Sequence, residues 1–78
     1  MASKPYNGHA SWAAWNVALW IGNDEGIYNL ALDCVKRAGK RNGRAAHYFI
    51  ASIGESKTPD GARYSVRSVT AALRGLDS

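Results

Sequence analysis

The sequence predicts an all-α fold, a compact bundle of three to four short helices with one long connecting loop. Several segments repeat apolar residues at the three- and four-residue spacing of a helix face. Each of these segments is short and is bounded by glycine or by a side chain that can cap a helix. The 78 residues contain no internal repeat and no shift in composition, so we expect residues 1–78 to form one small helical domain, with residues 1–10 as an extended lead-in.

The first helix is expected directly after Ser11, whose hydroxyl can accept from an early helical N–H. This segment is apolar apart from Asn16 and contains all three tryptophans of the chain. A domain of this size buries only a thin core, so its aromatic side chains must supply much of the stability. We therefore expect Trp15 and Trp20 to be buried, and Trp12, at the helix start, to be the exposed one.

Glycine and a polar residue mark the boundary to the second helix. Gly22 suits the position after the end of the first helix, and Asn23 can cap the next one. We expect this second helix from about Asp24 to Ala38, ended by Gly39. Its buried stripe would comprise Ile27, Leu30, Ala31, Cys34, Val35 and Ala38.

A third helix is expected after Asn42 and is ended by Gly54. Its buried face would comprise Ala46, Phe49, Ile50 and Ile53. The same stretch is rich in residues that also favour β-structure, so a strand remains an alternative there.

The long connection runs from Glu55 to Ser65 and contains the sequence Thr58-Pro59-Asp60-Gly61, which fits a β-turn. Ser65 or Ser68 could then cap a short last helix. The residues of this helix that we expect to face inward are Val66, Val69, Leu73 and Leu76.

Positive charge is concentrated in one place. The formal net charge is +4, and five cations lie within nine residues that contain no acid: Lys36, Arg37, Lys40, Arg41 and Arg44. One explanation is stabilisation of a helix C-terminus, worth about 0.3–1 kcal/mol per charge. The other is a contact surface for an acidic partner or a nucleic-acid backbone. Five cations exceed what one helix end needs, so these five are the candidate partner-binding residues.

The sequence offers no constellation that supports catalysis or metal binding. Two histidines, His9 and His47, and the single cysteine, Cys34, lie far apart in the chain, which does not match a metal site. Cys34 lies on the apolar stripe and is expected to be a core residue. Asp24 and Glu25 are adjacent in a first helical turn, which is a capping arrangement. We therefore expect no enzyme, no metal and no cofactor.

A single cysteine excludes an internal disulfide and is typical of a reducing compartment. No run of eighteen apolar residues is present, and the N-terminal stretch lacks the apolar core of a signal peptide. We expect a cytoplasmic protein.

Three binding modes remain open from the residues alone. The tryptophans could stack on bases, as in single-strand binders. Residues 23–53 could form a helix-turn-helix with Arg44, His47 and Tyr48 on the recognition helix. A nearly all-apolar first helix could also hide Trp12 or Trp20 in a homodimer interface, so the chain would be a monomer or a homodimer.

Three short motifs resemble one family. Tyr6-Asn7-Gly8, the run from Trp15 to Tyr28 and the Thr58–Gly61 turn are similar to a signature of small proteins encoded by bacteriophages, prophages and plasmids. Ala14 stands where that family usually has threonine, and the stretch of residues 36–44 is more basic than the family pattern.

The resemblance implies an accessory protein of a mobile element. Such proteins frequently block host defence, so it implies a non-enzymatic, anti-CRISPR-like or anti-restriction protein acting in the host bacterial cell. The partner would be a host defence protein complex, either a CRISPR effector or a restriction enzyme, contacted through the five cations. The alternative is a small DNA-binding regulator that uses the same cations against phosphate.

Overall fold

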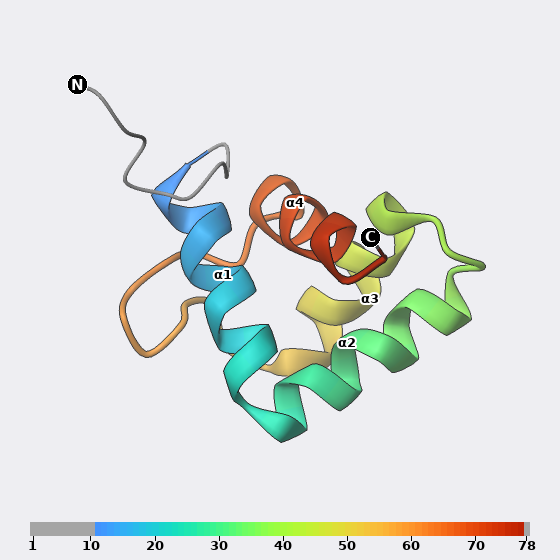
Figure 1. The fold of residues 1–78 in the computed structure, drawn as a ribbon, viewed down its shortest axis with the longest axis horizontal. Helices are drawn as coiled ribbons and strands as arrows, with labels where there is room; N and C mark the ends of the chain where they lie inside the picture. Colours follow the sequence, from blue (N-terminus) through green and yellow to red (C-terminus); the bar gives the residue numbers. More distant parts are fainter. Residues whose placement is uncertain (1–10, 78) are drawn as a thin grey trace.

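Four helices make up the described part of the chain, residues 11–77 of a computed structural model (Figure 1). They are α1 (Trp12–Asn23), α2 (Glu25–Arg37), α3 (Asn42–Ile53) and α4 (Val66–Asp77). The predicted all-α bundle is confirmed, and the segment with strand-forming residues is helix α3. Residues 11–77 contain no strand beyond one isolated antiparallel bridge between Lys57 and Arg63. The predicted lead-in, residues 1–10, lies outside the described residues.

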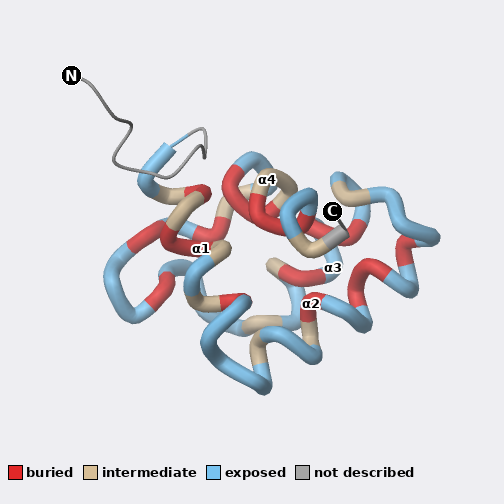
Figure 2. The backbone as a smooth tube through the Cα atoms, viewed as in Figure 1, coloured by how far each residue is buried: buried red, intermediate tan, exposed pale blue. Residues whose placement is uncertain are grey.

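The helices form a closed ring of packed pairs. Helix α1 packs on α2 and α4, and α3 packs on the same two helices. The buried segments lie on the inner sides of all four helices (Figure 2). None of the described helices is long and apolar enough to cross a membrane.

Small and medium side chains form most of the core. The largest fully buried side chains are Phe49, Ile21, Leu73, Val17, Val69, Asn16 and Cys34. Phe49 also meets the ring of Tyr64 edge to face, with ring centroids 5.6 Å apart. Phe49 is thus the aromatic centre of the bundle.

The expectation that Trp15 and Trp20 are core residues is wrong. Both are only half-buried and neither belongs to the buried cluster, while Trp12 is 40% exposed, as expected. The reason is the rotation of α1 about its own axis. Its buried face carries Ala14, Val17 and Ile21. Side chains of this size let neighbouring helices approach closely, and the indoles are too large for that seam.

One residue, Asp24, forms the boundary between α1 and α2. Its N–H donates to the Trp20 carbonyl oxygen at 3.0 Å, and its Oδ1 accepts from the Ile27 N–H at 3.0 Å. The expected boundary was wrong by one or two residues, since Gly22 lies inside α1 and Asn23 is its last residue. A carboxylate satisfies the free N–H groups of α2 and also complements the positive end of its dipole.

The starts of α3 and α4 differ in their capping. Asn42 does not cap α3: it is the first helical residue, and its Oδ1 is buried without a hydrogen-bond partner in the described structure. Before α4, the Ser65 hydroxyl accepts from the Ser68 N–H at 3.1 Å, and the Ser68 hydroxyl accepts from the Ser65 N–H at 3.0 Å. Both predicted serines therefore take part in one reciprocal cap.

Two other expectations concern single positions. Val66 is 39% exposed although it shares a helical stripe with the buried Val69 and Leu73, because it is the first residue of α4 and lies at the end of that stripe. Gly54 ends α3 as expected, with φ at +75°.

Replacing Phe49 should destabilise the protein far more than replacing Trp12. We expect Phe49→Ala to lower the free energy of unfolding by about 3–5 kcal/mol, because it leaves a cavity in the core. Trp12→Ala should change it by less than about 1 kcal/mol, because that side chain is largely exposed. Urea unfolding followed by circular dichroism measures both, and equal losses would contradict this description of the core.

Candidate functional site

The turn between α2 and α3 is fixed by backbone hydrogen bonds. The Lys40 N–H donates to the Val35 carbonyl at 3.0 Å, and the Gly39 N–H donates to the Lys36 carbonyl at 3.2 Å. These two bonds are the Schellman pattern that ends a helix. The Arg41 N–H then donates to the Ala38 carbonyl at 3.2 Å. The backbone that carries the cations is therefore well ordered by its own bonding.

Lys40 has an unusual backbone conformation for its residue type. Its φ is +68°, directly after Gly39 at +64°. A left-handed conformation costs a residue with a Cβ roughly 1 kcal/mol, and glycine or asparagine would fill the position with less strain. Nothing in the backbone of this turn requires a lysine there.

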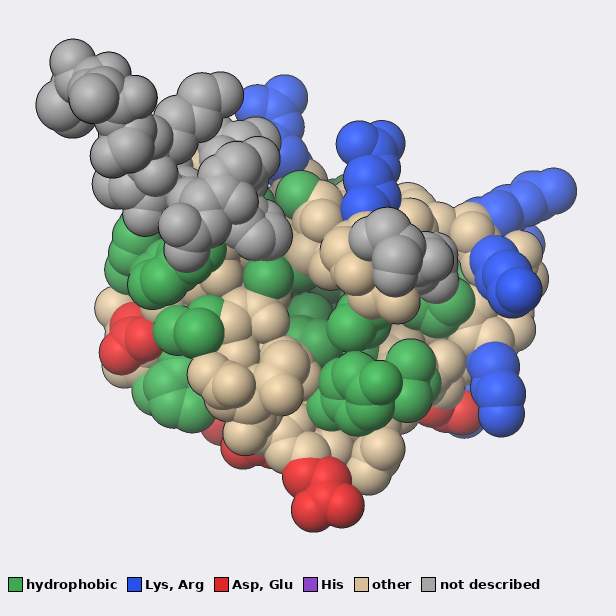
Figure 3. Space-filling view, in the orientation of Figure 1, with side chains coloured by type: hydrophobic (Ala, Val, Ile, Leu, Met, Phe, Trp, Pro, Cys, Tyr) green, Lys and Arg blue, Asp and Glu red, His purple; other side chains and the backbone are tan. Residues whose placement is uncertain are grey.

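All five predicted contact residues are exposed at or next to this turn. The Arg37 Nε lies 3.2 Å from Asp33 Oδ2, in an ion pair whose side chains are 67% and 54% exposed. An exposed pair of this kind contributes little to stability, about 0–1 kcal/mol. In the space-filling view, Lys and Arg side chains project from the end of the molecule where α2 meets α3 (Figure 3).

Helix α3 extends this surface. Arg44, His47 and Tyr48 lie at helical spacing and are all exposed, whereas Ala45 and Phe49 point into the core. A connection of only four residues, from Ala38 to Arg41, joins α2 to α3. The structure thus places Arg44, His47 and Tyr48 of the predicted helix-turn-helix on one exposed face of α3, which begins at this turn.

A second group of polar side chains joins α1 to the long loop. Asn16 is only 1% exposed. Its Nδ2 donates to Asp60 Oδ2 at 2.9 Å, and its Oδ1 accepts from the Thr58 hydroxyl at 2.6 Å. The Trp20 Nε1 also donates to Asp60 Oδ2, at 3.0 Å. The pairing of Asn16 with this loop was not predicted.

The same loop is closed by its own backbone. The Thr58 hydroxyl accepts from the Ala62 N–H at 3.0 Å, and the Gly61 N–H donates to the Thr58 carbonyl at 2.9 Å. Gly61 has a φ of +94°, which only glycine adopts without strain. The predicted β-turn is confirmed. One sequence signal could have revealed its partner, since Asn16 is the sole polar residue between Trp12 and Ile21.

The polar groups of this network are occupied by structural bonds. Hydrogen bonds from Asn16 and then Trp20 lower the pKa of the Asp60 carboxyl, partly opposed by desolvation. Asp60 is therefore held as a carboxylate that accepts two bonds, which suits an anchor better than a proton donor.

The one cysteine is in a chemically inert setting. Cys34 is 1% exposed, and burial raises the pKa of its thiol, with a further rise from Asp33 and an opposing effect of Arg37. A thiol of this kind is a poor nucleophile. Among residues 11–76 no group of three histidine, cysteine or acidic side chains could hold a metal ion. His9 lies outside the described residues.

The model of a protein family of unknown function, DUF7249, matches residues 2–73, and the chain belongs to this family. No protein of curated function and no solved structure matches the chain significantly. The family description specifies no activity, ligand or partner.

Asp60 should make stability depend on pH. Its carboxyl has a lower pKa in the folded protein than the value of about 3.9 in an unfolded chain, so it stabilises the fold above about pH 4. This contribution is lost as pH falls through the folded pKa. Asp60→Asn keeps a hydrogen-bond acceptor but not the charge, so at pH 7 its free energy of unfolding should be lower than that of the wild type. This difference should become smaller as the pH falls from 7 to 2. Urea midpoints at each pH test this, and a constant deficit would contradict it.

Lys40→Gly tests whether the lysine at this position stabilises the fold. Glycine relieves the left-handed strain, so we expect the free energy of unfolding to rise by up to about 1 kcal/mol. If the cations served stability alone, the same change would lower it. Chemical unfolding measures the difference, with Lys57→Gly, at a bridged loop position, as the control that should lose stability.

Proposed function

We propose that this member of DUF7249 is a non-enzymatic protein of a phage or other mobile element that binds and inhibits a host defence complex. The contact residues are Lys36, Arg37, Lys40, Arg41 and Arg44. The observation that carries the proposal is the exposed cationic cluster on a hydrogen-bonded turn, where Lys40 stands in a left-handed conformation. The motif resemblance to small phage and plasmid proteins supports the class of origin.

A rigid cationic surface suits inhibition by binding. A preorganised backbone loses little entropy on association, and the cluster steers the protein toward acidic surfaces. Because the chain is basic, it would cover an acidic or apolar surface of a protein subunit, or contact a guide RNA, and would not imitate DNA. A CRISPR effector and a restriction enzyme are the two target types.

The bonding of Asp60 and the burial of Cys34 support a non-enzymatic role. Asp60 is bonded to α1, and the Cys34 thiol is enclosed in the core. The exposed polar groups at the turn are mainly cations, which bind and position anionic groups.

A DNA-binding regulator is the second candidate, and the geometry of α3 favours it. Arg44, His47 and Tyr48 form one exposed face next to a four-residue turn, as on a recognition helix. The cations of the turn would then lie against phosphates.

Charge reversal at the turn should abolish partner capture. We expect the triple variant Lys40→Glu, Arg41→Glu and Arg44→Glu to stay folded, because all three side chains are exposed, and to lose its partner and its inhibition of host defence. The measurements are a tagged pull-down from bacterial lysate, with and without nuclease treatment, and phage plating on a defence-proficient host.

The matched control reverses three exposed cations elsewhere: Lys57, Arg63 and Arg67. It changes the net charge equally and should keep both activities. If both triple variants bind as the wild type does, the cluster is not the contact surface. Recovery of nucleic acid alone, lost on nuclease treatment, would overturn the inhibitor and favour the DNA-binding regulator.

A further inference from the structure

Helix α2 carries an exposed apolar pair on its outer face. Tyr28 is 39% exposed and Leu32 is 40% exposed, one helical turn apart. The pair lies at the edge of the buried stripe, where Ala31 and Cys34 are fully buried and Val35 is 7% exposed. Glu25 precedes the pair toward the helix N-terminus, and Lys36 follows it toward the C-terminus. Within the described residues, neither charge has an ion-pair partner. The outer face of α2 is thus acidic, apolar and basic in succession.

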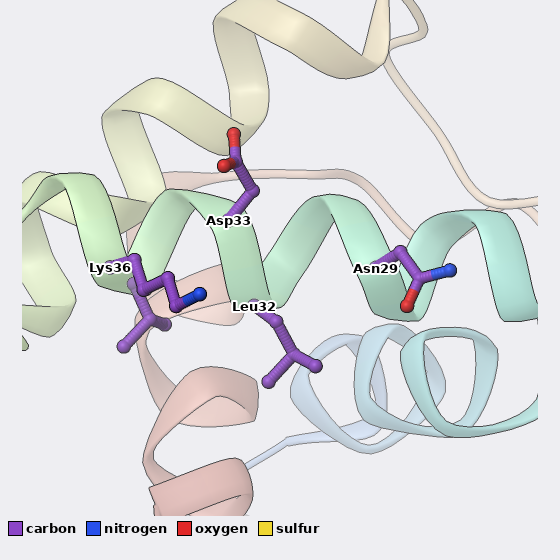
Figure 4. Close-up of a pocket in the computed structure, with 5 residues that line it drawn as sticks. Asn29, Leu32, Asp33 and Lys36 are labelled. Carbon is purple, nitrogen blue, oxygen red and sulfur yellow. The ribbon is translucent and has the colours of Figure 1, made fainter.

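A shallow hollow lies on the same face (Figure 4). It is lined by Asn29, Leu32, Asp33, Val35 and Lys36. In this view Leu32 extends below the helix and Asp33 above it, and Asn29 and Lys36 lie between them. Residues 29, 32, 33 and 36 have the spacing i, i+3, i+4 and i+7. Four residues at this spacing form the hole that accepts a side chain when two helices pack.

This face is complementary to itself. In an antiparallel pair of α2 helices related by a two-fold axis, two residues that contact each other lie at equal distances from the axis along the helix. Two different contacts can therefore form together only if the midpoints of their sequence positions coincide. The midpoint between Glu25 and Lys36 falls between Leu30 and Ala31. The midpoint between Tyr28 and the hollow, centred on residues 32 and 33, falls at the same place. One register therefore brings both pairs to matching heights along the two helices.

We propose that α2 is a homodimer interface and that the occupant of this surface is a second copy of the chain. Tyr28 of each protomer fills the hollow of its partner and packs beside Leu32. Glu25 of each protomer pairs with Lys36 of the other, so both ends of the seam carry opposite charges. A two-fold axis makes every contact occur twice.

The apolar surface on α1 does not have this property. Trp12 and Leu19 are similarly exposed, at 40% and 37%, but the first turn of α1 contains no acid and its last turn no base. Nothing on that helix specifies a register for a second copy. The homodimer expected from the sequence through Trp12 or Trp20 is therefore relocated to α2.

The dimer is compatible with the cationic contact surface. Lys36 enters the seam, and the other four cations remain near the outer ends of the helix pair, at and beyond the α2–α3 turn. A single helix pair buries less than a standard interface of about 1,600 Å², so the association should be reversible and dependent on concentration.

Sedimentation velocity between about 10 μM and 1 mM protein tests the proposal. The wild type should shift from monomer toward dimer across this range. Leu32→Ala should raise the dissociation constant at least about tenfold. Leu19→Ala is the matched control, since it removes an equally exposed leucine from α1, and it should dimerise as the wild type does.

A charge-swap cycle tests the register. Glu25→Lys and Lys36→Glu should each weaken the dimer, because like charges would then meet at both ends. The double variant should restore it. If the two substitutions weakened the dimer only by destabilising α2, the double variant would be weaker than either single variant, because each change opposes the helix dipole. Circular dichroism confirms folding of each variant.

A wild type that stays monomeric at 1 mM would overturn the proposal. So would a dimer that Leu32→Ala leaves intact, a dimer lost equally with Leu19→Ala, or a double charge variant weaker than either single variant.

Discussion

The buried amide of Asn16 is the interaction on which the rest of the fold depends. It accepts from Thr58 and donates to Asp60, and so holds the long loop against α1. The loop then delivers Tyr64 to the edge of Phe49 and Ser65 to the start of α4. Since α4 packs on both α1 and α3, the hydrogen bonds of Asn16 to the loop close the ring of helices. An amide is suited to the task because it donates and accepts at once in a place that water does not reach.

The same hydrogen bonds explain why the polar residues of the two motifs, residues 15–28 and 58–61, need not form a reactive site. Asn16, Trp20, Thr58 and Asp60 come from two distant segments and meet in one network. Their donors and acceptors are directed at one another, so these motif residues have a structural role. The contact surfaces that we propose lie elsewhere, at the α2–α3 turn and on α2. Helix α2 thus contributes residues to the core, to the proposed dimer interface and to the cationic turn.

Much of the helix content could be predicted because it depends on local patterns. The stripe through Ala31, Cys34 and Val35 and the αL glycine at Gly54 are specified by residues close in sequence. The cationic cluster could be predicted for the same reason, since it spans one turn. The boundary at Asp24 was placed one or two residues early because Gly22 and Asn23 are also good terminators, and only the hydrogen bonds distinguish them.

The sequence by itself predicted an all-α chain of three to four helical segments, a β-turn at residues 58–61 and a concentration of positive charge at residues 36–44. Only the tertiary structure decided which side of α1 is buried. A helix that is apolar nearly all round has no preferred face, so packing buries Ala14, Val17 and Ile21 and leaves the tryptophans half-buried or exposed. The partner of Asn16 was likewise decided in three dimensions, because a hydrogen bond across more than forty residues leaves no periodic trace in the sequence.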